Sequence, residues 1–464
     1  MSTYLHYDAL ILGSGQAGTP LASHLRSLNL SVCLVERAHI GGCCVNEGCT
    51  PTKTMVASGR MAYLVRRATE YGVHDGEGTP RITVAMQEVR ERKKDIVDSF
   101  RGGGEKRLEA AGVVVEAGRR GSWGEERGGL RWGRGKKVVT AERVFVNVGC
   151  RPARPEVPGL DDIPLERVLD STSIQELGEV PGHLVVVGGG YIGLEFAQLF
   201  RRLGADVSII HRGPGLLSRN DDPELVQCMQ RILEEDGIDI IFSATSTTFS
   251  NSPSSSAEEA HDLPIRVTTL SAGEKKDFHA SHILLATGRV PNTSTLNLSS
   301  AGISTTSSGY IPTSPSLQTN IPGIYAMGDV KGGPAFTHVS YDDFRILKAH
   351  LAGETARTTE DRTGLVPSVV YTDPQFAHIG PKWGELPKGR GLVSYSMLKA
   401  VIDPSTNKII SFSAIAVEAG EIMAVVQMAM VGGLTWMAVR DAVFAHPSWA
   451  ECLNNLWGGE RKEI

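Results

Sequence analysis

The chain has 464 residues and a formal net charge of −5. This length accommodates about three domains, each with its own core, and the acidic balance argues against nucleic acid or anionic lipid as a partner. Its seven cysteines do not form a secreted-type disulfide framework, and no apolar run approaches the roughly 18 residues needed to span a bilayer. We therefore expect a cytoplasmic enzyme that binds neither nucleic acid nor a membrane.

The chain opens on a predicted strand, the glycine-rich turn G-S-G-Q-A-G at 13–18, a helix and a second strand. This is the complete fingerprint of a dinucleotide-binding unit. Gly13 allows the tight turn, Gly15 lets the backbone approach a pyrophosphate, and Gly18 packs the helix on the strand, while the helix N-terminus attracts phosphate. Glu36 ends the second strand, where its carboxylate can bind both ribose hydroxyls.

Cys44 and Cys49 follow this unit with four residues between them, ahead of an apolar-periodic helix. Two thiols at this spacing can close a small ring within a distorted first helical turn, and a helix N-terminus lowers the pKa of a thiol. One sulfur can therefore be a thiolate at neutral pH. By itself the spacing also fits two unrelated core cysteines, so the residues around the pair must decide.

Two polar segments have an uncertain structure from composition alone. The segment 119–137 interleaves arginine, glycine and tryptophan as some RNA-binding tails do. Because it lies between two valine-rich strands, turn glycines and solvated arginines on a surface β-meander explain it more simply. A serine-rich run at 243–256 is predicted to be a long surface loop.

The dinucleotide fingerprint occurs a second time, with the turn G-G-G-Y-I-G at 188–193 between a strand and a helix. Its three glycines are Gly188, Gly190 and Gly193. The next strand ends in His211 and Arg212, with Arg219 close behind, where an NAD site carries an acid for the 2′-hydroxyl. Cations suit a 2′-phosphate, so we expect NADPH rather than NADH. The alternative is that these are solvated surface side chains.

The stretch 41–53 reads G-G-C-C-V-N-E-G-C-T-P-T-K and matches the signature G-G-x-C-x-N-x-G-C-x-P-x-K at every fixed position. The chain thereby resembles the pyridine nucleotide-disulfide oxidoreductases, the family of glutathione reductase, lipoamide dehydrogenase and mercuric reductase. Further motifs follow in family order, namely A-T-G-R at 286–289, G-D at 328–329 and H-P-S-W-A-E at 446–451. The resemblance implies an α/β fold with two Rossmann-like dinucleotide-binding domains and a C-terminal α+β dimerisation domain. It also implies FAD and a pyridine nucleotide as cofactors, the latter expected from His211 and Arg212 to be NADPH, and a homodimer.

The family's domain order implies boundaries for this chain. An FAD-binding domain would cover 1–155 and resume as a central part over 291–365, on either side of an NAD(P)H-binding domain over 156–290. The dimerisation domain would cover 366–464. One departure from the family is 381–399, a short passage rich in Gly and Pro where relatives have a longer helix and strand. It leaves the sheet and the substrate rim of this domain open.

The resemblance also implies roles for individual residues. Cys49 would lie next to the flavin and form the charge-transfer thiolate, and Cys44 would be the exposed sulfur that attacks substrate. Lys53 would lie by flavin N5, paired with Glu195, and Tyr191 would cover the nicotinamide pocket. These last three could also be a surface lysine, a surface glutamate and a packed tyrosine.

Other motif positions would contact the cofactors. Asp329 follows a strand, where a carboxylate can reach a ribityl hydroxyl of FAD. Gly149 belongs to N-V-G at 147–149, a variant of the family's first A-T-G, and Gly288 belongs to the second A-T-G. Cys43 stands where threonine is common. It is either a third thiol for metals or exchange, or a small buried residue in place of threonine.

His446 and Glu451 resemble the family's H-P-x-x-x-E dyad, which the other subunit of the homodimer contributes. Histidine ordinarily titrates near neutral pH, so it can take a proton from one thiol and return it to a leaving thiolate, while the carboxylate orients the ring. A lone histidine is more often structural, but the motif around His446 favours catalysis. The active site would then be shared between subunits.

Three functions remain open. The first is NADPH-dependent reduction of a small disulfide or related thiol compound, favoured by His446. The second is reduction of mercuric or another metal ion, because the motif wording is most like the mercuric-reductase-like branch. Against it, the chain shows neither an N-terminal metal-binding domain nor a C-terminal vicinal cysteine pair, and no metal site of its own is expected. The third is a non-catalytic FAD-binding dimer, which intact Cys44 and Cys49 argue against. The sequence does not name the electron acceptor.

Overall fold

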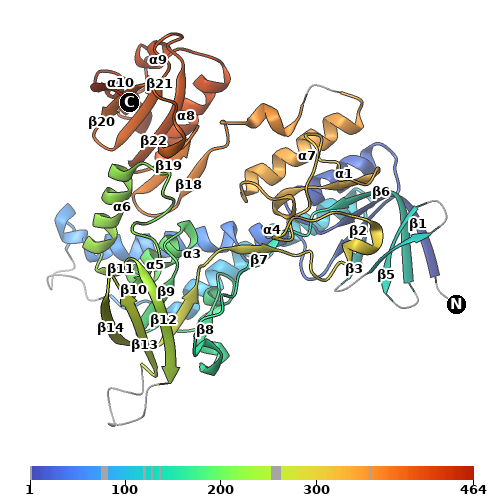
Figure 1. The fold of residues 1–464 in the computed structure, drawn as a ribbon, viewed down its shortest axis with the longest axis horizontal. Helices are drawn as coiled ribbons and strands as arrows, with labels where there is room; N and C mark the ends of the chain where they lie inside the picture. The colour runs from blue at the N-terminus through green and yellow to red at the C-terminus, as the bar shows by residue number, and fades with distance from the viewer. Residues whose placement is uncertain are drawn as a thin grey trace. The chain divides into compact units, whose positions relative to one another are not determined.

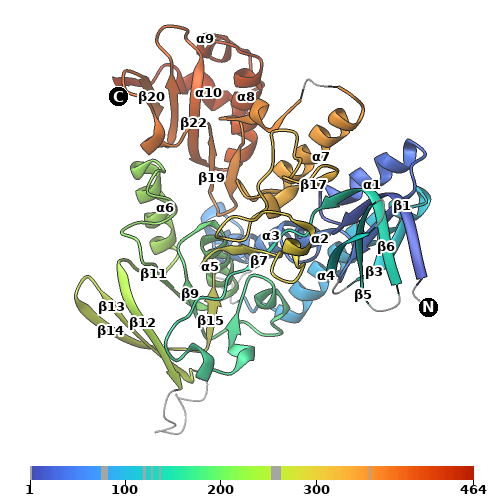
Figure 2. The ribbon, with the colours of Figure 1, turned by 45° about the vertical axis from the view of Figure 1, so that its right-hand side comes forward.

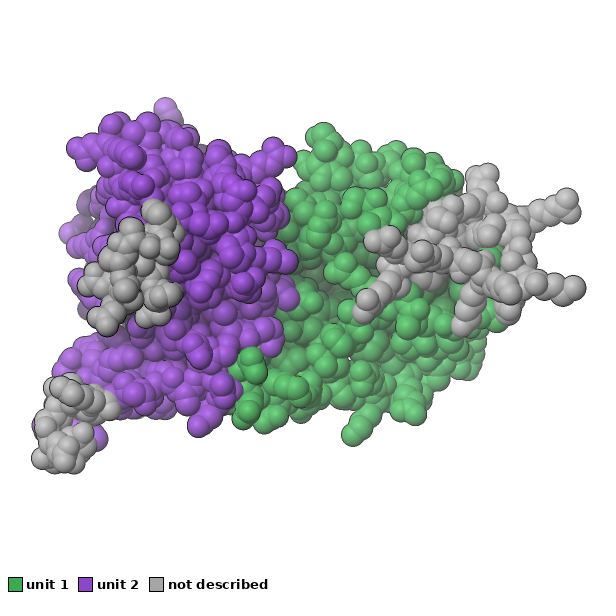
Figure 3. Space-filling model, turned by 90° about the horizontal axis from the view of Figure 1, so that it is seen from below, with its two compact units in different colours: residues 1–54, 90–153, 289–363 green, residues 55–89, 154–288, 364–464 purple. Residues whose placement is uncertain are grey.

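The computed structural model describes residues 3–74, 82–118, 122–126, 129–134, 137–251, 263–354 and 357–464. The chain divides into two compact units, which Figure 3 colours separately. Unit 1 comprises 1–54, 90–153 and 289–363, and unit 2 comprises 55–89, 154–288 and 364–464.

A seven-stranded sheet in the order β3-β2-β1-β6-β5-β4, with β17 also paired to β6, forms unit 1 (Figure 1). All pairs among β1, β2, β3, β6 and β17 are parallel, whereas β4 and β5 are antiparallel additions. The strands are β1 (Thr3–Leu12), β2 (Val32–Glu36), β3 (Val114–Ala117), β4 (Ser122–Glu126), β5 (Gly129–Arg134), β6 (Lys137–Val146) and β17 (Ile324–Ala326). A two-stranded sheet of β7 (Cys150–Pro152) and β16 (Arg289–Pro291) completes it.

The continuous apolar run of β1 is explained by burial on both faces of this sheet. Ala9 and Ile11 belong to one core, to which helices α1 (Gly18–Ser27) and α7 (Thr337–Leu351) contribute. Leu10 and Leu12 belong to a second core on the opposite face. A parallel strand covered on both sides carries such unbroken apolar sequence rather than an alternating one.

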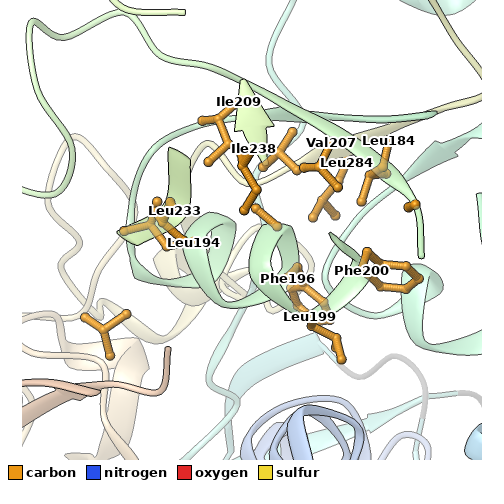
Figure 4. Packing of buried hydrophobic residues seen from close by; sticks show 14 of the residues in the cluster. Leu184, Leu194, Phe196, Leu199, Phe200, Val207, Ile209, Leu233, Ile238 and Leu284 are labelled. Atoms are coloured by element: carbon orange, nitrogen blue, oxygen red, sulfur yellow. The ribbon is translucent and has the colours of Figure 1, made fainter. Parts of the chain in front are cut away.

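Unit 2 contains a second parallel sheet, in the order β11-β10-β9-β15-β8. Its elements are β8 (Val168–Leu169), β9 (His183–Val187), β10 (Asp206–Ile210), β11 (Ile238–Ile241), β15 (His282–Leu285), α5 (Tyr191–Leu203) and α6 (Pro223–Glu235). Figure 4 shows Phe196 and Phe200 of α5 beside Leu184, Val207 and Leu284 of three of these strands. The packing of this apolar face of α5 against the sheet holds the helix directly after the second glycine turn.

The serine-rich run is only in part what the sequence predicted. Residues 252–256 lie outside the described residues, but β12 (Ala244–Asn251) is a strand, paired antiparallel with β13 (Ile265–Ser271), which pairs in turn with β14 (Glu274–Ala280). The loop prediction is wrong for 244–251. Serine and threonine there are side chains of a half-exposed strand, and Phe249, 3% exposed, anchors it in a core.

The C-terminal part of unit 2 is a six-stranded sheet, ordered β18-β19-β22-β21-β20-β23 and packed against α8 (Figure 2). Its elements are β18 (Ser368–Val370), β19 (Gln375–Ile379), β20 (Gly391–Tyr395), β21 (Leu398–Ile402), β22 (Ile409–Ala416), β23 (Glu460–Glu463), α8 (Ala419–Val431), α9 (Trp436–Arg440) and α10 (Cys452–Leu456). The short passage 381–399 supplies β20 and the first residues of β21. The sheet therefore forms across the departure that the sequence left open.

The predicted α/β class is confirmed. Two sheets with parallel strands each have a glycine turn after one of their strands, and a C-terminal antiparallel sheet is packed with helices. The β-meander predicted for 119–137 is formed by β4, β5 and β6, while residues 119–121, 127–128 and 135–136 lie outside the described residues. Among the residues with described structure, no helix has the length and apolarity required to cross a membrane.

Candidate active site

The first glycine turn joins β1 to α1 and requires glycine at two positions. Gly13 has a φ of +98°, and a Cβ there would lie 2.4 Å from the Asn147 carbonyl oxygen. A Cβ on Gly18 would lie 2.2 Å from the Gly13 carbonyl oxygen. Larger residues would push the turn away from β6 and the helix away from the turn. The turn therefore has no side chains where a pyrophosphate would approach its backbone. This geometry fits the FAD that the sequence predicted.

Side chains at the ends of the two strands that flank β1 hold this turn, Glu36 of β2 and Asn147 directly after β6. Glu36, the last residue of β2, accepts the Ser14 backbone N–H at 3.0 Å and the Ser14 hydroxyl at 2.7 Å. In the amide orientation that satisfies its neighbours, Asn147 accepts the N–H groups of Gly18 and Gly15 at 3.1 and 3.2 Å and donates to the Met327 carbonyl at 3.2 Å. That Glu36 also binds ribose hydroxyls stays a prediction.

Two short helical segments bring the paired cysteines together. Cys44 lies in α2 (Gly42–Asn46), and Cys49 is the first residue of α3 (Cys49–Arg66). Gly48 joins them, and a Cβ there would lie 3.0 Å from the Cys43 carbonyl oxygen. The break between α2 and α3 is the distorted helical turn that the spacing predicted.

In this structure Cys44 and Cys49 are not joined in a disulfide. The hydrogen bond between the two side chains, together with burial, raises the pKa of the Cys44 thiol. Cys49 Sγ lies 3.3 Å from the Thr337 hydroxyl, at the N-terminus of α7. The hydrogen bond to Cys49 and burial therefore favour the protonated form of the Cys44 thiol. The thiolate was expected on Cys49 rather than on Cys44, and that assignment stays a prediction.

Cys43 lies in a partly buried polar cluster beside the pair. Arg289 Nη2 donates to Cys43 Sγ at 3.4 Å and to the Cys150 carbonyl at 2.7 Å. Burial raises the pKa of the Cys43 thiol and that of the Asp329 carboxyl. A thiol held neutral in this way agrees with the interpretation of Cys43 as a small buried residue in place of threonine.

The G-D motif at 328–329 is anchored by a buried carboxylate. Asp343 of α7, fully buried, accepts the Gly328 N–H at 2.7 Å and the Arg362 guanidinium at 2.6 Å, with Lys331 at 3.5 Å. These cations stabilise the charge of a group whose pKa is raised by burial. The network fixes the backbone from which Asp329 projects.

The second glycine turn, between β9 and α5, repeats the geometry of the first. Gly188 has a φ of +120°, and a Cβ there would lie 2.4 Å from the Ala286 carbonyl oxygen. A Cβ on Gly193 would lie 2.2 Å from the Gly188 carbonyl oxygen. His211, directly after β10, accepts the Gly189 N–H on Nδ1 at 3.1 Å. Both turns therefore have the shape that phosphate binding requires.

Lys53 and Glu195 lie in different units, so their predicted pairing stays a prediction. Glu195, 4% exposed, accepts the Tyr371 N–H at 2.9 Å. This excludes the plainer interpretation of Glu195 as a surface residue. Tyr191 is the first residue of α5 and 39% exposed, and its role over a nicotinamide also stays a prediction.

His446 and Glu451 are brought together as the H-P-x-x-x-E spacing predicted. His446 Nδ1 lies 2.9 and 3.1 Å from the two carboxylate oxygens of Glu451. The His446 side chain is 80% exposed, and that of Glu451 is 37% exposed. The carboxylate orients the ring through Nδ1 and leaves Nε2 directed away from it, as a proton-transfer group requires.

Sequence reasoning missed three residues of the site. Thr337 and Asp343 carry no local motif, and they reach the cysteine pair and the G-D motif through the folding of α7. Asn147 was treated only as a tolerable variation of A-T-G, although its amide holds the first glycine turn. The available signal was that Asn147, a polar residue, follows directly after the apolar end of β6.

The chain has two dinucleotide turns, a dithiol that follows the first dinucleotide unit, and a C-terminal antiparallel sheet with helices, among which the His–Glu pair lies. These features define a pyridine nucleotide-dependent flavoprotein. The family model "Pyridine nucleotide-disulphide oxidoreductase" matches residues 7–343, and the dimerisation-domain model of the same family matches residues 387–456. The chain belongs to the pyridine nucleotide-disulphide oxidoreductases.

Three groups of enzymes within this family contain proteins similar to this chain. The chain is 31% identical to the probable pyridine nucleotide-disulfide oxidoreductase RclA of Escherichia coli, over 97% of this chain and 98% of that protein. It is 30% identical to a dihydrolipoyl dehydrogenase of Halobacterium salinarum (96% and 94%) and 31% identical to a mercuric reductase of Staphylococcus aureus (96% and 81%).

The solved structures agree with the sequence comparisons. A structure described as a Cu(II) complex of the HOCl-induced flavoprotein disulfide reductase RclA has a TM-score of 0.83 and 30% identity. It covers 98% of this chain and 99% of that one. The protein is thus an FAD-dependent oxidoreductase of a family that acts on disulfides or mercuric ion, and it carries the family's dimerisation domain.

Proposed function

We propose that this protein is an NADPH-oxidising reductase of a small disulfide or related thiol compound. FAD, when bound at the first glycine turn, supplies the hydride acceptor that passes an electron pair from NADPH to the Cys44–Cys49 disulfide. The observation that carries the proposal is the hydrogen-bonded dithiol of Cys44 and Cys49, with Thr337 against the second sulfur. Retention of the His446–Glu451 pair supports disulfide chemistry in particular.

The chain's own residues account for the oxidative half of the cycle, in which the enzyme dithiol reduces the substrate disulfide. Cys44, after losing its proton to His446 of the other subunit, attacks one sulfur of the substrate and releases the first thiolate. His446 returns the proton to that thiolate, while Glu451 orients the ring. Cys49 then attacks the Cys44 sulfur, so the enzyme disulfide re-forms and the second substrate thiolate leaves. One NADPH and one proton are consumed for two thiols formed.

Reduction of a metal ion is the second candidate, because one relative is a mercuric reductase and the RclA structure is a Cu(II) complex. In that reaction the two thiolates would bind the ion, and the electron pair would reduce one Hg²⁺ or two Cu²⁺. No proton need be delivered to a leaving thiolate. Among the residues that the structure describes, no cluster of three or more His, Cys, Asp or Glu could hold a metal ion, so the cysteine pair would have to serve.

An acceptor screen with NADPH oxidation as readout distinguishes the two candidates. We expect turnover with at least one low-molecular-weight disulfide, and we expect His446→Ala to lower it by roughly 10²-fold or more. Cys44→Ser should abolish turnover with either class of acceptor. Sustained turnover with Hg²⁺ or Cu²⁺ in excess small thiol that is indifferent to His446→Ala, with no disulfide accepted, would replace this proposal by metal reduction.

A further inference from the structure

The ring of His211 is held inside the second dinucleotide turn. Nδ1 accepts the Gly189 N–H at 3.1 Å. A Cβ on Gly189 would lie 3.0 Å from His211 Cγ, and one on Gly213 would lie 2.6 Å from Nε2. The imidazole therefore lies between two glycines, where only bare backbone leaves it room.

Glu36 occupies the same position in the first dinucleotide unit. It directly ends the second strand of that unit, and its carboxylate accepts the N–H of Ser14, the middle residue of Gly13-Ser14-Gly15. Gly189 is likewise the middle residue of Gly188-Gly189-Gly190. His211 thus replaces a carboxylate as the acceptor that holds the glycine turn.

The replacement changes what the site offers to a ribose. A carboxylate has lone pairs to spare for ribose hydroxyls after it has accepted one N–H. An imidazole that accepts the Gly189 N–H on Nδ1 must be neutral in its turn-holding state, so it supplies neither an anion for a 2′-hydroxyl nor a positive charge for a 2′-phosphate. Burial, reinforced by the neighbouring charge of Arg212, lowers the pKa of His211 and favours this neutral form.

Positive charge for a 2′-phosphate must then come from the segment that follows His211. Arg212 and Arg219 are both exposed. The segment between them returns to the turn, because the Leu217 N–H donates to the Gly189 carbonyl at 2.9 Å and Leu216 lies against Gly189. Both arginines thus belong to a segment that is tied to the turn on which the adenosine half of the nucleotide would lie.

We propose that His211 is a positioning residue that holds the second glycine turn in its neutral form and takes no part in recognition of the 2′-phosphate, which the proposed use of NADPH then leaves to Arg212 and Arg219. This inference rests on the proposed use of NADPH. The sequence pattern assigned phosphate recognition to His211 and Arg212 together. The structure favours separate roles, with His211 holding the turn and the arginines binding the phosphate.

The test uses three single variants of the FAD-loaded enzyme. Arg212→Gln removes the charge at the surface. His211→Asn keeps an acceptor where Nδ1 stands, and His211→Leu removes it at similar volume. Binding of adenosine 2′,5′-bisphosphate is measured by calorimetry, and KM and kcat are measured for both NADPH and NADH.

Arg212→Gln should weaken adenosine 2′,5′-bisphosphate and raise the KM for NADPH by about tenfold or more, and leave the KM for NADH unchanged. His211→Asn should stay within about threefold of wild type for all of them. His211→Leu should raise the KM for NADPH and NADH by a similar factor at unchanged kcat, because the turn serves the pyrophosphate that both share.

Two results would overturn the inference. One is selective loss of adenosine 2′,5′-bisphosphate binding in His211→Asn with no loss in Arg212→Gln, which would make His211 itself the phosphate ligand. The other is His211→Leu with wild-type KM values, which would remove the positioning role. A wild type that prefers NADH and does not bind the bisphosphate contradicts the proposed function and the role of Arg212. The ratio of the NADH KM values of His211→Leu and His211→Asn then still decides the role of His211.

Discussion

The thiol proton distinguishes the two redox cysteines. Cys44 donates its hydrogen bond to Cys49 and has a raised pKa, whereas Cys49 faces the hydroxyl of Thr337. The motif alone shows that the two sulfurs are a pair, but it does not show which of them keeps the proton. The Thr337 hydroxyl acts on both sulfurs: it lies 3.3 Å from Cys49 Sγ, 288 residues distant in the chain, and it lowers the pKa of Cys44 against the larger effects of the hydrogen bond to Cys49 and of burial.

Thr337→Val should therefore raise the pKa of the Cys49 thiol, because a hydrogen bond to a thiolate favours the charged form. The measurement is the pH titration of the long-wavelength charge-transfer absorbance in a Cys44→Ser background. We expect the midpoint to move upward by about one pH unit. Thr337→Ser, which keeps the hydroxyl, is the control and should titrate like the parent. Equal midpoints in the valine and serine variants would show that the hydroxyl does not stabilise the thiolate.

At the scale of elements, α5 has a polar face that holds the loop between β18 and β19. Glu195, Gln198 and Arg202 lie on one side of the helix, and each bonds this loop. Gln198 exchanges two hydrogen bonds with the backbone of Asp373, and Arg202 pairs with the Asp373 carboxylate at 2.7 Å. Sequence reasoning assigned Glu195 from a motif but gave no signal for the other two, because their partner lies 171 or more residues away.

Removing the charge of Arg202 should destabilise unit 2 strongly. The guanidinium is 6% exposed and pairs with Asp236 and Asp373, so Arg202→Met leaves the Asp236 carboxylate, 10% exposed, without this cation and the Asp373 carboxylate with only Arg60 at 3.7 Å. We expect a loss of about 3–5 kcal/mol in the free energy of unfolding, measured by denaturant titration.

Arg154→Met, which breaks an exposed pair with Asp161, is the matched control and should change this free energy by less than about 1 kcal/mol. Equal effects of the two substitutions would mean that the α5 network does not hold the loop.

Elements were predictable from sequence where their pattern is local, and not elsewhere. Both glycine turns, with the strand and helix around each, follow from spacings within 20 or so residues. Strand β12 was missed because its serines and threonines suit a loop equally well, and only the pairing with β13 and the burial of Phe249 decide it. The domain boundaries inferred from family order remain predictions.

At the scale of the whole molecule, several histidines are buried or partly buried, which favours their neutral form. Burial lowers the pKa of His24, His211 and His378, and that of His282 to about 4. The unfolded chain binds a proton at each of these residues near pH 6.5, whereas the folded chain does not. Their contribution to stability is therefore present above pH 6.5 and is lost as the pH falls toward 4.

His282→Asn should reduce this sensitivity to acid. Between pH 7 and pH 5, we expect the unfolding temperature of the variant to fall less than that of the wild type, because one fewer site takes up a proton on unfolding. His279→Gln, which replaces an exposed histidine on β14, should follow the wild type. An acid-induced fall in His282→Asn as large as that of the wild type would refute the assignment.

The central claim is that Cys44 and Cys49 form a disulfide that accepts electrons from NADPH through the flavin. Anaerobic titration of the FAD-loaded protein with NADPH, followed by absorbance, tests it most directly. The account predicts that the protein takes up more than the one electron pair that FAD holds, and that a long-wavelength band appears from the Cys49 thiolate. Cys44→Ser should show this band without added reductant, and Cys49→Ser should lack it. A wild type that is fully reduced by a single equivalent of NADPH, with no such band and with spectra unchanged by either substitution, would contradict the claim.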